Sequence, residues 1–529
     1  MHKNTLLFIG ALLLLVFGFV LMSGPKQTPA TPIPDVLSIQ TVDIPNGNTY
    51  DLVASYVMKT IGGKKIKMLA YNGMIPGPTL RVQEGAQVTI HFTNKTDMPT
   101  LLHSHGVRMD NQYDGSQLVE KDILPGESFD YVLKFTDPGV YWYHPHVRED
   151  RQQVMGLYGN FLVTPNDPAY WSPADREETL FLSDILMEDD AIAPFSDKYI
   201  THAMMGRFGN TLFANAQTNL AMTALPGEVQ RLYVTNAATV RPFDFRINGA
   251  KMKLVGGDNG RMEKETFIDD VILAPAERAI IDVYFPAAGT YAIEHKTPLK
   301  VYTLGSVTVS GVSPKVSHQA EFTVLRTNAL ETKTFMDLRH YLSNAPDKIL
   351  HLTSNINMMK IMNYPGVTMM THNAAGQDVP MNMTNSGMMT MGASTNTPPI
   401  EWEDQMGAMN TYSTSDTVKW ILRDEATGKE NMDIDWKFKQ GDMVKIRIVN
   451  DKDSMHPMQH PIHFHGNRFV VLATNGVPND NMVWKDTTLL RTGDTVDILL
   501  DASNVGKWMA HCHIAEHMHA GMMLEYDVE

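Results

Sequence analysis

Four pairs of histidines, each pair separated by one residue and placed in register with a repeat of the chain, are the residues best suited to do chemistry. The pairs are His103 and His105 in LLHSHG, His144 and His146 in WYHPH, His463 and His465 in HPIHFHG, and His511 and His513 in HCH. Residues i and i+2 of a strand point to the same side, so each pair aims two imidazoles in one direction. Imidazole is a good ligand for copper, and eight imidazoles can hold three copper ions. The spacing therefore predicts a metal cluster rather than unrelated surface histidines.

The only cysteine of the chain, Cys512, lies between His511 and His513. A thiolate, two imidazoles and a weak axial thioether define a blue-copper electron-transfer site. The sequence offers this set as Cys512, His517 and Met522 near the C-terminus, with His460 as the second imidazole. An electron that enters such a site can leave through the Cys512 backbone into the two adjacent histidines. Packing of a small buried thiol, the alternative role, does not explain that adjacency.

The strands that position these residues belong to a pattern that occurs three times. Its first half reads EGAQVTIHFTN, PGEVQRLYVTN and QGDMVKIRIVN. Its second half keeps a constant interval of 13 residues, from Gly126 to Gly139, from Ala276 to Gly289 and from Gly493 to Gly506. The segments alternate apolar and polar residues and are separated by Gly, Pro, Asn and Asp, which is typical of antiparallel β-sandwiches. We predict three similar β-sandwiches in tandem.

The histidine pairs follow this repeat. Copies one and three carry all eight histidines at two matching places, and copy two has Arg246, Asn248, Glu294 and Lys296 there. Two pairs from each of two copies imply one shared cluster between the first and third sandwiches. The second sandwich is then expected to act as a spacer that brings them together.

The segments LLHSHG, WYHPH, HPIHFHG and HCHIAEHMHAGM resemble the four copper-binding signatures of the multicopper oxidase family, which includes laccases and cuprous oxidases. The resemblance extends over about residues 45–529. It implies an all-β fold of three tandem cupredoxin-like Greek-key β-sandwich domains, expected at residues 46–165, 166–315 and 316–529. It also implies four copper ions per chain, with O2 reduced to water at the expense of a reducing substrate.

The resemblance further implies a role for each ligand. His460, Cys512 and His517 would bind type 1 copper, with Met522 axial. His103 and His463 would bind type 2 copper. The type 3 pair would be bound by His105, His144, His146, His465, His511 and His513. Glu516 and Asp114 are candidates for the path that delivers protons to O2, as acids of the family at similar positions do.

A methionine-rich stretch bears on the substrate. Residues 358–409 contain 12 of the 36 methionines and have no strand or helix period, so we predict an irregular exposed insertion at residues 355–410. Thioethers favour Cu(I), and the segment is similar to the Met-rich segment of bacterial cuprous oxidases. The alternative is a flexible apolar lid over a pocket for an organic substrate.

The residues just before His460 give a second indication. Met458 matches a methionine that helps cuprous oxidases hold substrate copper, and His456 stands where those enzymes have an aspartate. Histidine also ligates copper, so His456 and Met458 form a candidate site for a substrate metal ion.

Three functions remain open at this point. The first is an oxidase of Cu(I) or other metal ions in copper tolerance, and the second is a laccase-like phenol oxidase. The third is a non-enzymatic copper-binding or structural protein. The net charge of −15 attracts cations and disfavours nucleic acid, which we do not expect as a partner.

The N-terminus predicts export. Residues 5–22 form an apolar run after Lys3, and a proline-containing stretch follows. We expect residues 1–23 to be either a cleaved signal peptide or an uncleaved membrane anchor, and residues 24–45 to be a linker. Either segment places the protein on the periplasmic or extracellular face, and we expect a monomer without an internal disulfide.

Overall fold

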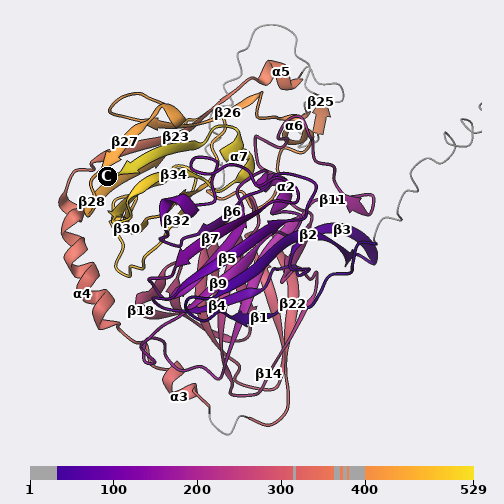
Figure 1. Cartoon of the computed structure of the whole chain (residues 1–529), viewed down its shortest axis with the longest axis vertical. Coiled ribbons are helices and arrows are strands. Elements are labelled where there is room, and N and C mark those ends of the chain that lie inside the picture. The colour runs from indigo at the N-terminus through magenta and orange to yellow at the C-terminus, as the bar shows by residue number, and fades with distance from the viewer. Residues whose placement is uncertain (1–31, 314–316, 363–369, 373–377, 381–398) are drawn as a thin grey trace, which may run out of the picture. The chain divides into compact units, whose positions relative to one another are not determined.

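The computed structural model describes residues 32–313, 317–362, 370–372, 378–380 and 399–529. Asp35–Glu529 form one compact unit in which strands predominate (Figure 1). None of the helices among the described residues is long and apolar enough to cross a membrane. The apolar run at residues 5–22, predicted as an export signal or anchor, lies outside the described residues.

The N-terminal part of this unit is built from two sheets. One sheet has the order β3-β2-β5-β7 and the other the order β1-β4-β9-β8-β6. The strands are β1 (Thr41–Asp43), β2 (Thr49–Ile61), β3 (Lys64–Tyr71), β4 (Thr79–Gln83), β5 (Gln87–Asn94), β6 (Leu102–His105), β7 (Ser128–Lys134), β8 (Gly139–Pro145) and β9 (Gly159–Thr164). The short helices η1 (Asn111–Tyr113) and α2 (Glu149–Gln152) follow β6 and β8.

The middle part repeats the arrangement with orders β13-β10-β15-β20-β17-β18 and β14-β22-β21-β16-β19. Its strands are β10 (Arg176–Ile185), β13 (Thr211–Ala214), β14 (Leu220–Ala224), β15 (Val229–Asn236), β16 (Phe243–Asn248), β17 (Lys251–Gly257), β18 (Gly260–Ile268), β19 (Val271–Leu273), β20 (Arg278–Tyr284), β21 (Gly289–Lys296) and β22 (Val301–Val309). A separate hairpin joins β11 (Met187–Glu188) to β12 (Ala191–Ile192).

The C-terminal part has the orders β26-β23-β28-β33-β30-β31 and β27-β35-β34-β29-β32. Its strands are β23 (Lys348–Ile356), β26 (Val418–Asp424), β27 (Asp435–Phe438), β28 (Asp442–Asn450), β29 (His460–Phe464), β30 (Arg468–Thr474), β31 (Val477–Pro478), β32 (Thr487–Leu490), β33 (Thr495–Ala502), β34 (Gly506–Cys512) and β35 (Met523–Val528). Helices α3 (Gln319–Phe322), α4 (Ala329–Leu338) and η2 (Arg339–Ser343) precede these strands, and α7 (Ala515–His519) follows β34. The remaining elements are α5 (Met358–Met362), β24 (Met370–His372), β25 (Asp378–Pro380), α6 (Ala408–Tyr412) and η3 (Asn431–Asp433).

The three parts share one topology, which confirms the predicted tandem β-sandwiches. The first repeat halves form the parallel partners of β2, β10 and β23, namely β5, β15 and β28. The 13-residue interval corresponds to the steps from β7 to β8, from β20 to β21 and from β33 to β34. We refer to the three parts as the first, second and third sandwich.

Strand β15 departs from the predicted alternation, since its eight residues are all buried. Its polar side chains face neighbouring structure instead of water. The Asn160 amide of the first sandwich, for example, donates to the Thr235 hydroxyl over 3.1 Å. A strand covered on both faces has no solvent side, so sequence alternation alone does not predict its exposure.

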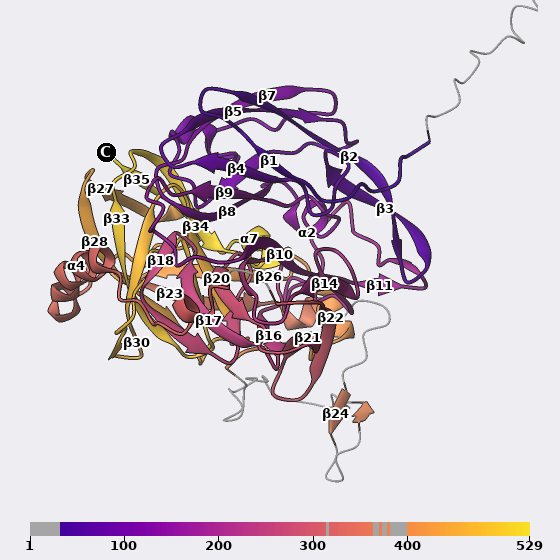
Figure 2. The same ribbon diagram turned by 90° about the horizontal axis from the view of Figure 1, so that it is seen from below.

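The hydrophobic cores explain how the site is held. The largest cluster contains residues of both the first and the third sandwich, such as Leu133 and Ile498, whereas the second sandwich has a core of its own around Phe245 and Ile281. Figure 2 shows β34 and α7 of the third sandwich beside β8 of the first. The strand ends that carry the histidine pairs therefore meet where these two sandwiches pack.

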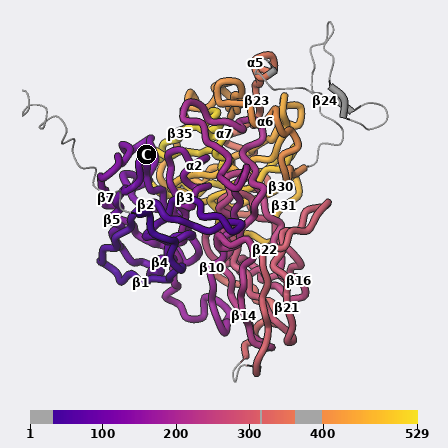
Figure 3. Tube along the Cα trace, turned by 90° about the vertical axis from the view of Figure 1, so that its right-hand side faces the viewer, coloured from indigo at the N-terminus to yellow at the C-terminus, as the bar shows by residue number. Residues whose placement is uncertain are grey.

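The predicted irregular, exposed insertion at residues 355–410 needs a correction at its two ends. Residues 358–362 and 408–412 are helical as α5 and α6, which lie close together (Figure 3). Met358, Met406 and Met409 pack partly buried against the largest core, because their apolar side chains find a protein surface there. Most of the methionine-rich segment between these helices lies outside the described residues.

Candidate metal centre

Strand pairing brings the histidine pairs together in register. His103 of β6 lies opposite His144 of β8, and in the third sandwich His463 of β29 lies opposite His511 of β34. The same positions of the second sandwich hold Arg246 opposite Glu294. Directly opposite residues of an antiparallel pair have Cβ atoms roughly 5 Å apart, so each ladder gathers its imidazoles on one face.

The second sandwich replaces this site with an ion pair. The Arg246 guanidinium donates to the Glu294 carboxylate over 2.8 Å from Nε, and Nη2 lies 2.7 Å from the same oxygen. A cation and an anion at matching positions stabilise each other without a metal, which is consistent with the loss of ligands predicted for this copy.

The histidines of the first and third sandwiches interleave at the interface. His105 stacks on His463 with ring centroids 3.7 Å apart, and His103 stacks on His465 at 4.1 Å. The ring centroids of His144 and His513 lie 5.2 Å apart, and those of His146 and His511 lie 5.3 Å apart. All eight rings are buried, so the structure assembles every residue that the sequence predicts for the cluster.

One nitrogen of most of these rings is occupied by a hydrogen bond. Nδ1 of His103 donates to the Asp114 carbonyl over 2.6 Å, Nδ1 of His144 to the Pro145 carbonyl over 2.8 Å, Nδ1 of His463 to the Asp486 carbonyl over 2.9 Å, and Nδ1 of His511 to the Cys512 carbonyl over 2.8 Å. Nδ1 of His465 donates to the Asp114 carboxylate over 3.0 Å, and Nε2 of His105 donates to the Asp486 carboxylate over 2.9 Å. Such bonds fix both the tautomer and the direction of an imidazole.

Six ring nitrogens of the cluster are buried without a hydrogen-bonding partner in the described part of the chain. They are Nε2 of His103, His144, His146, His463 and His513, and Nδ1 of His105. A buried polar atom without a partner costs free energy, and a metal ion supplies the missing partner. The donor set thus fits copper, since six imidazole nitrogens lack a protein partner and most of the rings are oriented by a hydrogen bond at the other nitrogen.

The electrostatics of the cluster favour neutral imidazoles. Burial lowers the pKa of seven of the eight histidines, that of His513 to about 3. A neutral imidazole offers the lone pair that a metal requires, whereas an imidazolium does not.

The candidate ligand atoms fall into overlapping groups of three, each within 4.8 Å of one another. Three groups consist of histidines alone, namely His103 with His105 and His144, His103 with His463 and His465, and His146 with His465 and His511, and a fourth joins His105 and His463 to Asp486. Overlap of this kind is expected when several ions share one ligand cage.

A second candidate site surrounds the Cys512 thiol. The Cys512 Sγ atom is 3.6 Å from Nδ1 of His460 and 3.9 Å from Nδ1 of His517, and the two nitrogens are 3.3 Å apart. Burial raises the pKa of the Cys512 thiol, so a nearby cation is needed to hold it as thiolate. Met522 is fully buried, and its carbonyl accepts a hydrogen bond of 3.0 Å from the Cys512 amide.

Trp420 covers this second site and was not predicted from the sequence. Its ring lies 4.1 Å from that of His517 and 4.9 Å from that of His460, and its indole Nε1 donates to the Ala203 carbonyl over 2.8 Å. Trp420 belongs to β26 of the third sandwich, and Ala203 lies in the part of the chain that forms the second sandwich. No spacing in the sequence predicts this contact.

The predicted substrate-metal residues have separate surroundings. Nε2 of His456 lies 3.1 Å from the sulfur of Met205, a residue missed by the sequence analysis, and the His456 ring lies 6.0 Å from the Trp420 ring. Burial lowers the pKa of His456 to about 4, which keeps its imidazole neutral. Met458 is fully buried within the largest core, which the first and third sandwiches share.

The two predicted acids are both buried but differ in their contacts. The Asp114 carboxylate accepts the hydrogen bond from His465, so it orients a histidine of the cluster. Neither carboxylate oxygen of Glu516 has a hydrogen-bonding partner among the described residues, and burial raises the pKa of Glu516 to about 8. Only Glu516 is therefore placed as an acid that is not already committed to a neighbour.

Two further carboxylates near the cluster were not predicted from the sequence. Asp486 contacts His105 and His463, and Glu149 lies 3.2 Å from Nδ1 of His146 and 2.6 Å from Nε2 of His519. Glu149 also lines a small cavity beside His144 and His513. Glu149 could have been predicted from its position three residues after His146. Asp486 is not close in sequence to any histidine of the cluster, so no local pattern points to it.

Comparison with known proteins agrees with this geometry. Residues 53–168, 178–311 and 378–529 each match sequence profiles described as multicopper oxidase. The copper resistance protein A homolog of Pseudomonas syringae pv. tomato is 27% identical, over 92% of this chain and 93% of that protein. Laccase-1 of Botryotinia fuckeliana is 25% identical, over 90% of this chain and 81% of that protein. The solved structure of a multicopper oxidase from Campylobacter jejuni, described as a metallo-oxidase, shares the fold with a TM-score of 0.69 and 23% identity, over 96% of this chain and 97% of that protein.

The buried histidine clusters and these matches define an oxidoreductase that uses copper. The chain belongs to the multicopper oxidase family.

Proposed function

We propose that this oxidase couples one-electron oxidation of Cu(I), or of another metal ion, to the four-electron reduction of O2 to water in copper tolerance. Four copper ions per chain would supply the electron transfer and the O2 reduction. The type 1 ion would be held by His460, Cys512, His517 and Met522, and the type 2 ion by His103 and His463. The type 3 pair would be held by His105, His144, His513 and by His146, His465, His511.

One observation carries this proposal. Cys512 closes strand β34 between two histidines of the cluster, and its Sγ lies within 4 Å of both His460 and His517. One short stretch of backbone thus joins the two predicted metal sites. Electron donors and acceptors linked through a single cysteine have a short covalent path, which a purely structural copper protein does not need.

Residues other than the copper ligands would orient the histidines and deliver protons to O2. Asp114 holds the ring of His465 through its carboxylate and the ring of His103 through its carbonyl. Glu516 is buried with both oxygens uncommitted, so it is proposed to hold and deliver a proton during reduction of O2. The buried setting excludes bulk water from both groups.

His456 and Met205 support a soft metal ion as the reducing substrate. A neutral imidazole and a thioether favour Cu(I), and both lie on the Trp420 side of the type 1 ligands. Met458 is retained as a further donor candidate. A relative that carries the name copper resistance protein A homolog agrees with this choice.

The runner-up is a laccase-like phenol oxidase, which the similarity to Laccase-1 of Botryotinia fuckeliana favours. Steady-state O2 consumption with Cu(I), Fe(II), Mn(II) and a methoxyphenol, with and without added Cu(II), separates the two. We expect the highest kcat/KM with Cu(I); a higher value for the phenol would favour the laccase function. Copper-loaded protein that consumes no O2 with any of them would favour the non-enzymatic alternative.

We also propose export, with the domain limits and monomeric state expected from the sequence. The apolar run at residues 5–22 supports export, and mass spectrometry of the mature N-terminus tests whether it is cleaved. Cell fractionation and sedimentation test the location and the monomer.

A further inference from the structure

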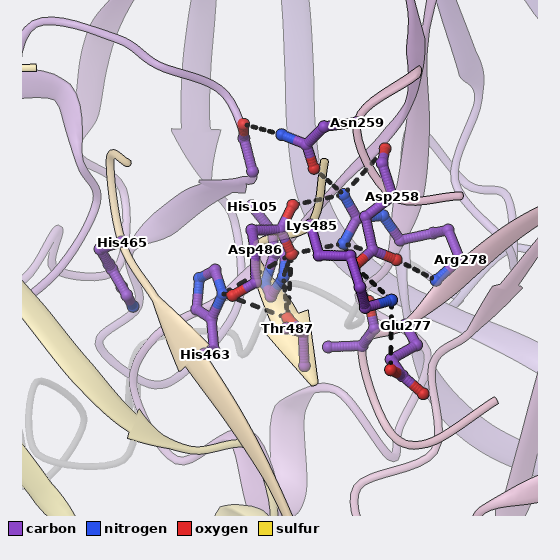
Figure 4. Close-up of polar contacts among 12 residues, drawn as sticks. His105, Asp258, Asn259, Glu277, Arg278, His463, His465, Lys485, Asp486 and Thr487 are labelled. Atoms are coloured by element: carbon purple, nitrogen blue, oxygen red, sulfur yellow. Dashed lines mark hydrogen bonds and ion pairs between the residues drawn. The ribbon is translucent and has the colours of Figure 1, made fainter. Parts of the chain in front are cut away.

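A buried arginine of the second sandwich reaches the metal-binding interface. Arg278 begins strand β20 and is fully buried. Its guanidinium grips the Asp486 carboxylate of the third sandwich with two parallel hydrogen bonds, Nη1 to Oδ1 at 2.6 Å and Nη2 to Oδ2 at 2.5 Å (Figure 4). A two-point contact of this kind fixes the plane of the carboxylate as well as its position.

Asp486 in turn accepts hydrogen bonds from two histidines of the cluster, His105 and His463. Its Oδ1 accepts a hydrogen bond of 2.9 Å from Nε2 of His105 in the first sandwich. Its backbone carbonyl accepts a hydrogen bond of 2.9 Å from Nδ1 of His463, and the Thr487 hydroxyl donates to Oδ1 at 2.9 Å. One residue therefore orients a histidine from each of the two ligand-bearing sandwiches.

Arg278 is itself held by all three sandwiches. Its Nε donates to the Val140 carbonyl of β8 over 3.1 Å, and its backbone amide donates to the Asp258 carboxylate of the second sandwich over 2.8 Å. Lys485 of the third sandwich lies 3.0 Å from Asp258 and 3.3 Å from Glu277. These contacts go beyond the spacer role that the sequence predicts for the second sandwich.

Gly106, the last residue of the HSHG segment, makes room for the pair. A Cβ atom at this position would collide with Oδ2 of Asp486 and lie 2.9 Å from Nη2 of Arg278. The arginine and the aspartate thus pack directly against the backbone turn that follows His105.

Electrostatics explain why Asp486 needs this partner. A carboxylate excluded from water is unfavourable unless a cation and hydrogen bonds compensate it. Arg278 compensates the charge and leaves Oδ1 able to accept the His105 N–H, and His105 then presents Nδ1 toward the cluster. Loss of a group that hydrogen-bonds to a metal ligand typically lowers metal affinity or activity by about 10- to 100-fold.

We propose that Arg278 is a positioning residue for the trinuclear site, acting through Asp486 on His105, so that the sandwich without copper ligands helps to determine how tightly copper is held. The inference rests on the proposed function, in that it takes the eight histidines to bind copper.

The test compares Arg278→Gln with Arg231→Gln in copper-loaded full-length protein. Arg231 is a matched control because it is also buried in the second sandwich and grips Asp282 with two hydrogen bonds, at 2.8 and 3.0 Å. The measurements are total copper per chain and the rate at which a chelator removes copper, with the blue absorption followed separately. We expect Arg278→Gln to speed copper loss about 10-fold or more while the blue absorption persists, and Arg231→Gln to match the wild type.

Two results would overturn the proposal. Copper loss at the wild-type rate from Arg278→Gln would show that the contact does not position His105. Equal acceleration in Arg278→Gln and Arg231→Gln would show general loosening of the second sandwich instead.

Lysine variants keep the test decisive if the glutamine variant does not fold. Arg278→Lys retains the charge without the two parallel hydrogen bonds, so it should lose copper faster than Arg231→Lys, and equal rates would overturn the proposal.

A double-mutant comparison tests the same contact from its other side. Asp486→Asn should resemble Arg278→Gln, and combining the two substitutions should add little because both act on one contact; additive effects would also count against the proposal. Wild-type protein that fails to bind copper beyond the blue site would refute the proposed function itself, independently of these comparisons.

Discussion

The sulfur of Met205 lies 3.1 Å from Nε2 of His456, although the two residues are 251 positions apart in the chain. The Trp420 ring lies next to the His456 ring and contacts His460 and His517, the two proposed type 1 histidines. A soft donor and an imidazole thus meet beside the predicted electron entry.

This contact leads to the first prediction, which concerns Met205→Leu. Leucine keeps the volume and apolar character, so folding should change little, by less than about 1.5 kcal/mol. Removing the thioether should lower kcat/KM for Cu(I) on the order of tenfold, the equivalent of one weak ligand contact, and leave oxidation of a methoxyphenol unchanged. Met204→Leu is the control, since Met204 is the adjacent buried methionine. Equal losses on both substrates would speak against a metal-substrate site.

The second prediction tests the blue site. Cys512→Ser should abolish the visible thiolate-to-copper absorption and nearly all turnover, because serine does not supply a thiolate. The fold should persist, since the two side chains are similar in size, and circular dichroism checks this. A variant that stays blue would refute the assignment of Cys512.

The third prediction concerns Glu516→Gln. Glutamine keeps the shape and removes the ionisable proton, so copper content and blue colour should stay as in the wild type. Reoxidation of the fully reduced enzyme by O2, followed by stopped flow, should slow by about 10²-fold, the lower end for loss of a general acid. An unchanged rate would mean that Glu516 has only a structural role.

The fourth prediction addresses the methionine-rich segment. Because Met358, Met406 and Met409 pack against the core, the deletion should spare α5 and α6 and replace residues 363–398 with a short Gly-Ser linker. If the segment collects Cu(I), kcat/KM for Cu(I) should fall, since many weak thioethers raise its local concentration. Phenol turnover should stay constant or rise.

The lid alternative makes the opposite prediction for the same deletion. Phenol turnover should then rise while Cu(I) oxidation is unaffected. Equal loss on both substrates would contradict both interpretations and assign the segment to the packing of the third sandwich.

The fifth prediction isolates the space that Gly106 provides. Gly85 and Gly106 share a φ of +82°, but an added Cβ at Gly85 meets nothing within 4 Å. Gly85→Ala should therefore destabilise the protein by about 1–2 kcal/mol through backbone strain alone. Gly106→Ala should cost clearly more and also lower the copper content, because Asp486 must move. Thermal unfolding and copper analysis of both variants check this, and equal behaviour would remove the case for close packing at Gly106.

Much of the site could be predicted from the sequence because its determinants are local. The H-x-H spacing places two imidazoles on one strand face, and the repeat places the strands, so the sequence alone predicts the candidate ligands at the ends of β6, β8, β29 and β34. The 13-residue interval likewise predicts two strands that follow each other in the chain in all three sandwiches. Period-two geometry is a property of each strand alone, and sequence patterns report it directly.

The tertiary structure alone decided what surrounds the ligands. Arg278 and Asp486 are 208 residues apart, and His105 and Asp486 are 381 apart, so no local spacing relates them. The burial of every residue of β15 and the packing of Met358 and Met409 against the core also depend on which surfaces meet. The sequence by itself determined which residues can ligate copper. How their rings are grouped, which carboxylates hold them and how the second sandwich reaches them follow from the packing of three sandwiches, because those contacts join residues that only folding brings together.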